Sequence, residues 1–137
     1  MLSTAFLQFW HAELNKMFFD GELETAYIRI GPEREDETVA EFEERTVPFM
    51  ITFFEGPATC LTDELFSIET LLHEMCHQYV REHELTEDDP HGPEFVRVAE
   101  SHGMKCGGYM LSDDARSRIG ERLSLYRAVA SLGFITA

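Results

Sequence analysis

Lysine is scarce in this sequence of 137 residues: Lys16 and Lys105 stand beside nine arginines. The 26 acidic residues bring the formal net charge to −15. Such a surface repels phosphate backbones and anionic lipids, so general binding of nucleic acid or of a membrane surface is disfavoured. An acidic, lysine-poor composition is also compatible with a high-salt cytoplasm.

Cysteine is scarce as well. Cys60, Cys76 and Cys106 are an odd number without paired spacing, which argues against a disulfide framework and favours a reducing compartment. No apolar run reaches the length of a membrane span, and the apolar residues 1–19 lack a basic start and a cleavage site. We therefore expect a soluble, cytoplasmic protein with no membrane partner.

What the chain does contain is enough apolar material for a packed interior. Its hydrophobic fraction is 44%, and it has eleven phenylalanines. Its length fits one domain over residues 1–137, with a core at about 4–108 and an additional C-terminal helix at about 113–132. No repeat or linker divides it.

Apolar residues at three- and four-residue steps predict helices, and short alternating or apolar segments predict strands. We expect an α+β fold in which a three- or four-stranded, mostly antiparallel sheet packs on the first helix and on the second. The acidic run 33–44 is interpreted as a solvated loop and strand face, and 106–108 as a flexible turn. The expected helices are 4–19, 63–83, 94–101 and 113–132, and the expected strands are 26–30, 39–45 and 47–54.

The second predicted helix carries the motif His73-Glu74-Met75-Cys76-His77. Residues i and i+4 share one helical face, so His73 and His77 can direct two imidazoles at one point. Glu74 lies beside that point, where it can act as a general acid and base. The pattern predicts a zinc site of the metallopeptidase type.

A catalytic zinc needs a third protein ligand. His91 follows His77 by 14 residues, and a loop of that length can fold back over the helix. Gly92 allows close backbone approach and Pro93 directs the exit, so His91 is the favoured ligand. Downstream alternatives, with Glu94 and Glu100 as the main competitors, are His83, His102, Glu82, Glu84, Glu94 and Glu100.

Three weaker features are left open by the sequence. The donor that stabilises the oxyanion could be Tyr109, Tyr126 or His102. Cys76 is interpreted as a small apolar filler. The arginines of the last helix are expected to pair with the protein's own acidic residues, with a nucleic acid or an acidic partner as the alternative.

Two segments in order resemble the SprT-like metallopeptidases, the family of the bacterial SprT proteins and the Spartan proteases. They are Thr70–His77 and His91-Gly92-Pro93-Glu94-Phe95, and the turn Phe18–Leu23 resembles the family's opening helix end. The resemblance covers roughly residues 14–108. It implies a small zincin-like metallopeptidase domain with zinc held by His73, His77 and His91 and with Glu74 as the catalytic residue.

The resemblance also implies an association with DNA or with DNA-bound proteins, as in SprT and Spartan relatives. Such proteins often carry a cysteine zinc ribbon or a basic region after the core. Here three cysteines cannot form a ribbon, and residues 115–137 instead carry four arginines and one glutamate. A DNA partner therefore stays open, although the net charge disfavours it.

The favoured hypothesis is a zinc endopeptidase acting on protein or peptide substrates. The alternative is a zinc-stabilised binding or adaptor module with little turnover, in which the metal organises the fold. Hydrolysis of a non-peptide amide or ester is a third possibility.

Overall fold

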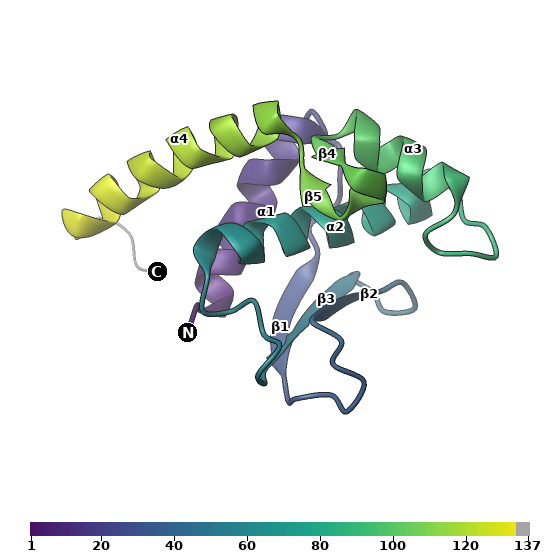
Figure 1. Cartoon of the computed structure of the whole chain (residues 1–137), viewed down its shortest axis with the longest axis horizontal. Coiled ribbons are helices and arrows are strands. Elements are labelled where there is room, and N and C mark those ends of the chain that lie inside the picture. The colour runs from purple at the N-terminus through teal and green to yellow at the C-terminus, as the bar shows by residue number, and fades with distance from the viewer. Residues whose placement is uncertain (134–137) are drawn as a thin grey trace.

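The computed structural model describes residues 1–133, and residues 134–137 lie outside the description. The helices and strands are shown in Figure 1. In chain order they are α1 (Thr4–Phe18), β1 (Tyr27–Gly31), β2 (Ala40–Glu43), β3 (Met50–Phe54), α2 (Glu64–Glu82), α3 (Pro93–Ser101), β4 (Met104–Lys105), the 3-10 turn η1 (Cys106–Gly108), β5 (Met110–Leu111) and α4 (Asp113–Ser131).

The fold is α+β, as predicted, and each of the four predicted helices begins and ends within one residue of the structure. Side-chain caps account for three of the helix starts. Ser3, Asp63 and Ser112 accept hydrogen bonds from backbone N–H groups in the first turns of α1, α2 and α4. Pro93 occupies the first turn of α3, where its missing N–H leaves no donor unpaired.

The main sheet has three strands in the order β1-β3-β2. β2 and β3 form the expected antiparallel pair, whereas β1 runs parallel to β3, so the sheet is mixed. β3 is the most apolar strand and four of its five residues are buried, while β2 is half-buried throughout. Placing β3 between the other two covers both of its edges and leaves β2 at one edge of the sheet.

α2 is the central element, since it contacts α1, α3 and the edge strand β2. Its buried residues lie on several faces and include Ile68, Leu71, Leu72, Met75 and Cys76. Residues from α1 through to Tyr126 of α4 join one hydrophobic core. The prediction of a single domain over 1–137 stays a prediction, because its last four residues lie outside the described part.

The segment between α3 and α4 differs from the prediction of a flexible turn. β4 and β5 pair as a short antiparallel ribbon around η1. Gly107 and Gly108 have φ angles of 73° and 97°, in the left-handed region that favours glycine. The apolar periodicity used to find strands cannot detect strands of two residues.

Within residues 1–133, no helix has both the length and the apolar character required to cross a bilayer.

A buried polar contact joins α1 to α2. The His11 ring and the Gln78 side chain lie 2.9 Å apart, and both residues are almost fully buried. Gln78 also donates to the backbone oxygen of Glu24 and to the carboxylate of Glu82. Since Gln78 follows His77 directly, these bonds hold the motif helix in place against α1 and the segment that precedes β1.

Burial lowers the pKa of His11 below its usual 6.5, despite the opposing hydrogen bond from Gln78. Below about pH 6.5 the unfolded chain binds a proton that the folded chain excludes, so His11 makes stability fall as the pH falls. Urea unfolding should therefore show the wild type losing about 1 kcal/mol more than the His11→Gln variant between about pH 7.5 and 5.5. Equal losses in the two proteins would contradict a neutral buried His11.

Candidate metal centre

Three imidazoles meet above the middle of α2. His73 and His77 lie one helical turn apart, with ring centroids separated by 5.1 Å. His91 arrives from the loop before α3, and its ring centroid lies 5.3 Å from that of His73 and 4.9 Å from that of His77. One nitrogen of each ring can be chosen so that all three lie within 4.8 Å of one another. The three side chains could therefore hold one metal ion.

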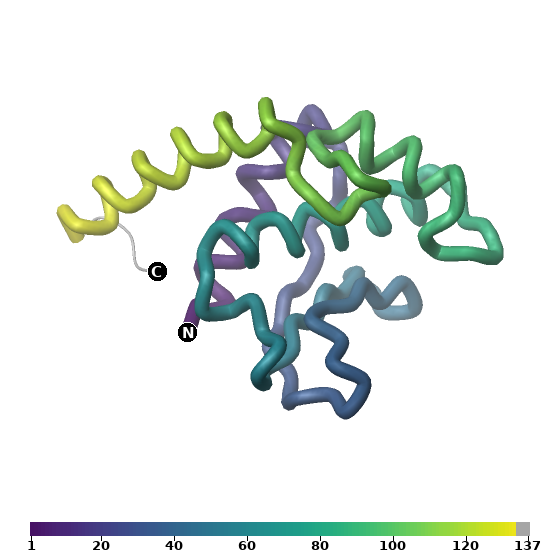
Figure 2. Tube along the Cα trace, viewed as in Figure 1, coloured from purple at the N-terminus to yellow at the C-terminus, as the bar shows by residue number. Residues whose placement is uncertain are grey.

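The loop that carries His91 leaves the end of α2 and turns back to start α3, as the trace in Figure 2 shows. Its shape depends on local carboxylates: Asp89 accepts the backbone N–H of His91, and Glu87 accepts that of Glu94. A Cβ atom on Gly92 would lie 2.7 Å from a Glu87 oxygen, so glycine leaves room for this side chain within the loop.

Phe95 of α3 forms the apolar support behind the three rings. Its ring stacks on His77 at 4.2 Å and lies 5.0 Å and 5.2 Å from His73 and His91. Phe95 is 1% exposed. A buried aromatic ring against all three imidazoles limits their rotation, which keeps the ligand atoms directed at a shared point.

Gly108 orients His73 from the other side. The Nδ1–H group of His73 donates to the carbonyl oxygen of Gly108 at 2.6 Å, which leaves Nε2 as the ligand atom. A Cβ atom at residue 108 would lie 2.7 Å from the Phe95 ring. The sequence did not predict the hydrogen bond between His73 and Gly108. The adjacent glycines Gly107 and Gly108 were the available signal, since they indicate a backbone conformation that other residues rarely adopt.

The electrostatics of the cluster suit metal binding. Burial lowers the pKa of His73, and burial together with the neighbouring His73 and His91 lowers the pKa of His77 to about 3. Both rings are therefore neutral at pH 7 and can offer a lone pair. Together with His91 they make a set of three imidazoles, a donor set that fits zinc and related divalent ions.

Glu74 lies beside the cluster and is 6% exposed, with a carboxylate oxygen 4.0 Å from His73 Nε2. Burial, followed by the negative charge of Glu41, raises the pKa of Glu74 to about 8 against the opposing backbone hydrogen bond of Phe42. A cation held by the histidines would instead lower the pKa of Glu74, because it stabilises the charged carboxylate. The carboxyl group is thus placed to exchange a proton with a molecule in the site.

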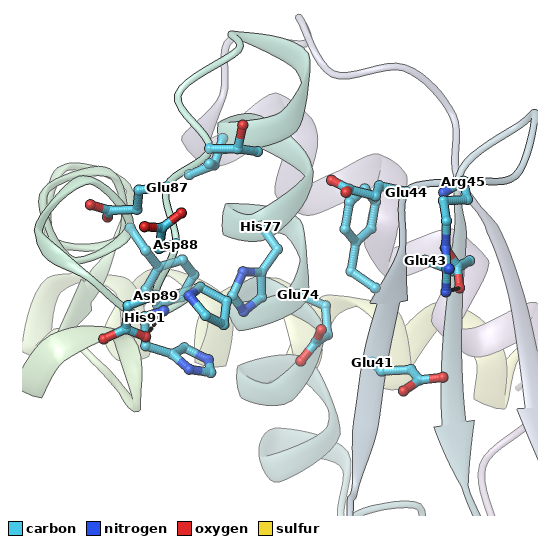
Figure 3. A pocket seen from close by; sticks show the side chains of 15 residues that line it. Glu41, Glu43, Glu44, Arg45, Glu74, His77, Glu87, Asp88, Asp89 and His91 are labelled. Carbon is cyan, nitrogen blue, oxygen red and sulfur yellow. Dashed lines mark hydrogen bonds and ion pairs between the residues drawn. The ribbon is translucent and has the colours of Figure 1, made fainter.

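The site opens into a cleft of about 580 Å³ (Figure 3). Glu74 and His77 lie between the β2 side and the loop before α3. Part of the acidic run interpreted as solvated, namely Glu41, Glu43 and Glu44, borders this cleft. The lining residues are Glu41–Arg45, Glu74, His77, Val80, Thr86–His91 and Phe95.

Three of the residues considered as alternatives to His91 for the third ligand make other contacts in the structure. His83 stacks on Tyr79 and approaches Glu22, and His102 stacks on Phe19. Glu94 pairs with Arg97. Within residues 1–133, the one group of side chains that could share a metal ion is His73, His77 and His91.

The structure also separates the three candidate oxyanion donors. The ring of Tyr109 lies 5.1 Å from that of His73 and 5.6 Å from that of His91. Tyr126 is instead packed against Phe6 of α1, and His102 is stacked on Phe19. Of the three, Tyr109 is the residue beside the histidine cluster.

Two other sequence interpretations agree with the structure. Cys76 is fully buried, as expected of an apolar filler, and burial raises the pKa of its thiol. The arginines of α4 each have an acidic neighbour within this chain. The pairs are Arg116–Glu69, Arg118–Asp114, Arg122–Glu13 and Arg127–Glu64.

A small zincin-like α+β domain is defined by this arrangement: a helix-borne histidine pair, a third histidine from a later loop and a buried glutamate at one possible metal site. The SprT-like family model matches residues 7–113, and the chain belongs to the SprT-like family. Comparison with curated proteins finds no match for it. The family membership confirms the resemblance seen in the sequence, and with the histidine cluster it supports a metallopeptidase-like, metal-binding domain.

Proposed function

We propose that this protein is a zinc-dependent endopeptidase of the His-Glu-x-x-His type that hydrolyses peptide bonds in protein substrates. The observation that carries the proposal is the convergence of three histidines beside a buried carboxyl group in an open cleft. A purely structural zinc site is closed by four protein ligands, whereas a catalytic site keeps a position free. A site with three imidazole ligands matches the catalytic kind, which keeps one position free.

In the proposed mechanism, His73, His77 and His91 hold the zinc, and Gly108 and Phe95 fix the orientation of the rings. Bound zinc supplies Lewis acidity, which acidifies water and polarises the scissile carbonyl. Glu74 accepts a proton from the attacking water as its oxygen bonds to the carbonyl carbon. The same carboxyl then gives that proton to the amine nitrogen as the carbon–nitrogen bond breaks.

The proposed substrate is a protein or peptide, and the acidic lining of the cleft supports a peptide rather than a nucleic acid as its occupant. DNA-associated proteins stay within this class as substrates. The free thiols of Cys60, Cys76 and Cys106 favour a reducing location such as the cytoplasm.

Removing the metal tests the proposal. Zinc-loaded protein should cleave an unfolded protein substrate, chelation should lower the rate by roughly 100-fold or more, and added zinc should restore it. Circular dichroism before and after chelation distinguishes loss of catalysis from loss of the fold. Metal-free, folded protein that cleaves at the original rate would contradict the proposal.

Tyr109 is the proposed donor to the carbonyl oxygen as negative charge develops there. Replacing Tyr109 with phenylalanine should lower kcat by about 100-fold with little change in zinc content. Tyr27→Phe is a matched control, because Tyr27 is similarly exposed but lies on β1, at the sheet edge away from the cleft. Equal kcat values for the Tyr109 and Tyr27 variants would remove Tyr109 from the mechanism.

A further inference from the structure

Acidic residues are concentrated at the cleft. Seven of its fifteen lining residues are aspartate or glutamate, against 26 of 137 in the whole chain. Besides Glu74 they form two walls, which are labelled in Figure 3. The sheet wall is Glu41, Glu43 and Glu44, and the loop wall is Glu87, Asp88 and Asp89.

The two walls face the same reactive groups. Glu74 and His77 come from α2 and lie between them, and His91 belongs to the loop wall side. The carboxylates are therefore not an isolated surface patch, because they flank a cavity that already contains a possible metal site. A chain bound in the cleft therefore lies between two negatively charged walls.

Arginines offset only part of this charge. On the sheet wall, Glu41 lies 2.9 Å from Arg34, Glu43 lies 3.1 Å from Arg45, and Glu44 lies 3.6 Å from Arg81. These contacts are exposed, so solvent and salt weaken them.

On the loop wall, the carboxylates of Glu87 and Asp89 accept backbone N–H groups rather than guanidinium groups. Asp88 has no hydrogen bond or ion pair with any residue in the described range 1–133. The walls thus hold six carboxylates against three guanidinium groups.

We propose that the cleft selects basic peptide segments, with lysine or arginine close to the bond that is cut. This inference rests on the proposed peptidase function and names its substrate class. A positively charged side chain that reaches either wall is attracted to it, whereas an acidic peptide is repelled by both walls. The cleft volume of about 580 Å³ has room for a few residues of an extended segment.

The test compares three peptides that share one scissile core and differ only in flanking lysine, glutamine or glutamate. At low salt, kcat/KM for the lysine peptide should exceed that for the glutamate peptide by at least about tenfold. The ratio should shrink severalfold at about 0.5 M salt, because screening weakens exposed charges. Equal values for the peptides, or a preference for glutamate, would overturn the inference.

Reversing the charge of wall residues tests whether the two walls cause the preference for lysine peptides. The double variant Glu44→Lys/Asp88→Lys changes one residue in each wall and should lower the lysine preference by roughly tenfold. The control Glu35→Lys/Glu121→Lys makes the same change in net charge at exposed positions that do not line the cleft, and it should keep the preference. If both variants lose the preference equally, overall charge is responsible and the walls are not.

Binding separates this inference from the proposed function. The zinc-loaded Glu74→Gln protein should bind a fluorescent lysine peptide more tightly than the glutamate peptide in an anisotropy titration. Preferential binding without cleavage of any peptide by the wild type would uphold the selection of basic peptides and refute the peptidase. Cleavage without any charge preference, in rate or in binding, would uphold the peptidase and refute the selection of basic peptides.

Discussion

Replacing Glu74 with glutamine is expected to lower kcat for peptide hydrolysis by roughly 1000-fold. Glutamine keeps the size of the side chain but cannot accept and return a proton. None of the three histidines is altered, so the zinc content should equal that of the wild type. Rates of peptide cleavage and zinc content per chain, measured on the same sample, test both parts.

A matched control for this variant is Glu64→Gln, at the start of the same helix. Glu64 pairs with Arg127 of α4 and does not line the cleft, so its loss should change kcat less than about twofold. If Glu74→Gln cleaves like the wild type, the proposed mechanism is wrong. Absence of cleavage by the zinc-loaded wild type itself would instead favour a domain in which zinc only stabilises a binding surface.

Replacing His91 with alanine should weaken zinc binding by more than about 100-fold. Even replacing a residue that only hydrogen-bonds to a metal ligand lowers metal affinity by about 10–100-fold. His91 is the most exposed of the three histidines and comes from a loop rather than from α2. Its removal should therefore spare the packing of the helix. Zinc content after dialysis, with circular dichroism as a check on the fold, measures the effect.

His83→Ala is the control for this experiment. His83 is also a histidine near the C-terminal end of α2, but its ring is stacked on Tyr79, outside the metal group. The variant should retain the zinc content of the wild type. Unchanged zinc in His91→Ala would move the third ligand to another residue and contradict the proposed centre.

Helical periodicity was sufficient to predict where the four helices lie, because each carries buried apolar residues at three- and four-residue steps. The same periodicity placed His73 and His77 on one face of α2, and loop length brought His91 within reach. These parts of the candidate site follow from local geometry along the chain. Their role as ligands stays a prediction until a metal is measured.

Contacts across long sequence separations could not be predicted in this way. The parallel pairing of β1 with β3 depends on which strand occupies the centre of the sheet, which the individual strand patterns do not specify. The bond from His73 to Gly108 spans 35 positions and depends on two left-handed glycines. Each acidic segment by itself resembles a solvated loop, so the two walls of the cleft emerge only when the chain is folded.

The central claim is that three imidazoles, and no fourth protein ligand, hold one zinc ion. Zinc K-edge X-ray absorption of the purified wild type tests it most directly. We predict one zinc per chain with three histidine nitrogens at about 2.0–2.1 Å and one further light atom from solvent. A sulfur scatterer at about 2.3 Å, or fewer than three imidazoles, would contradict the account.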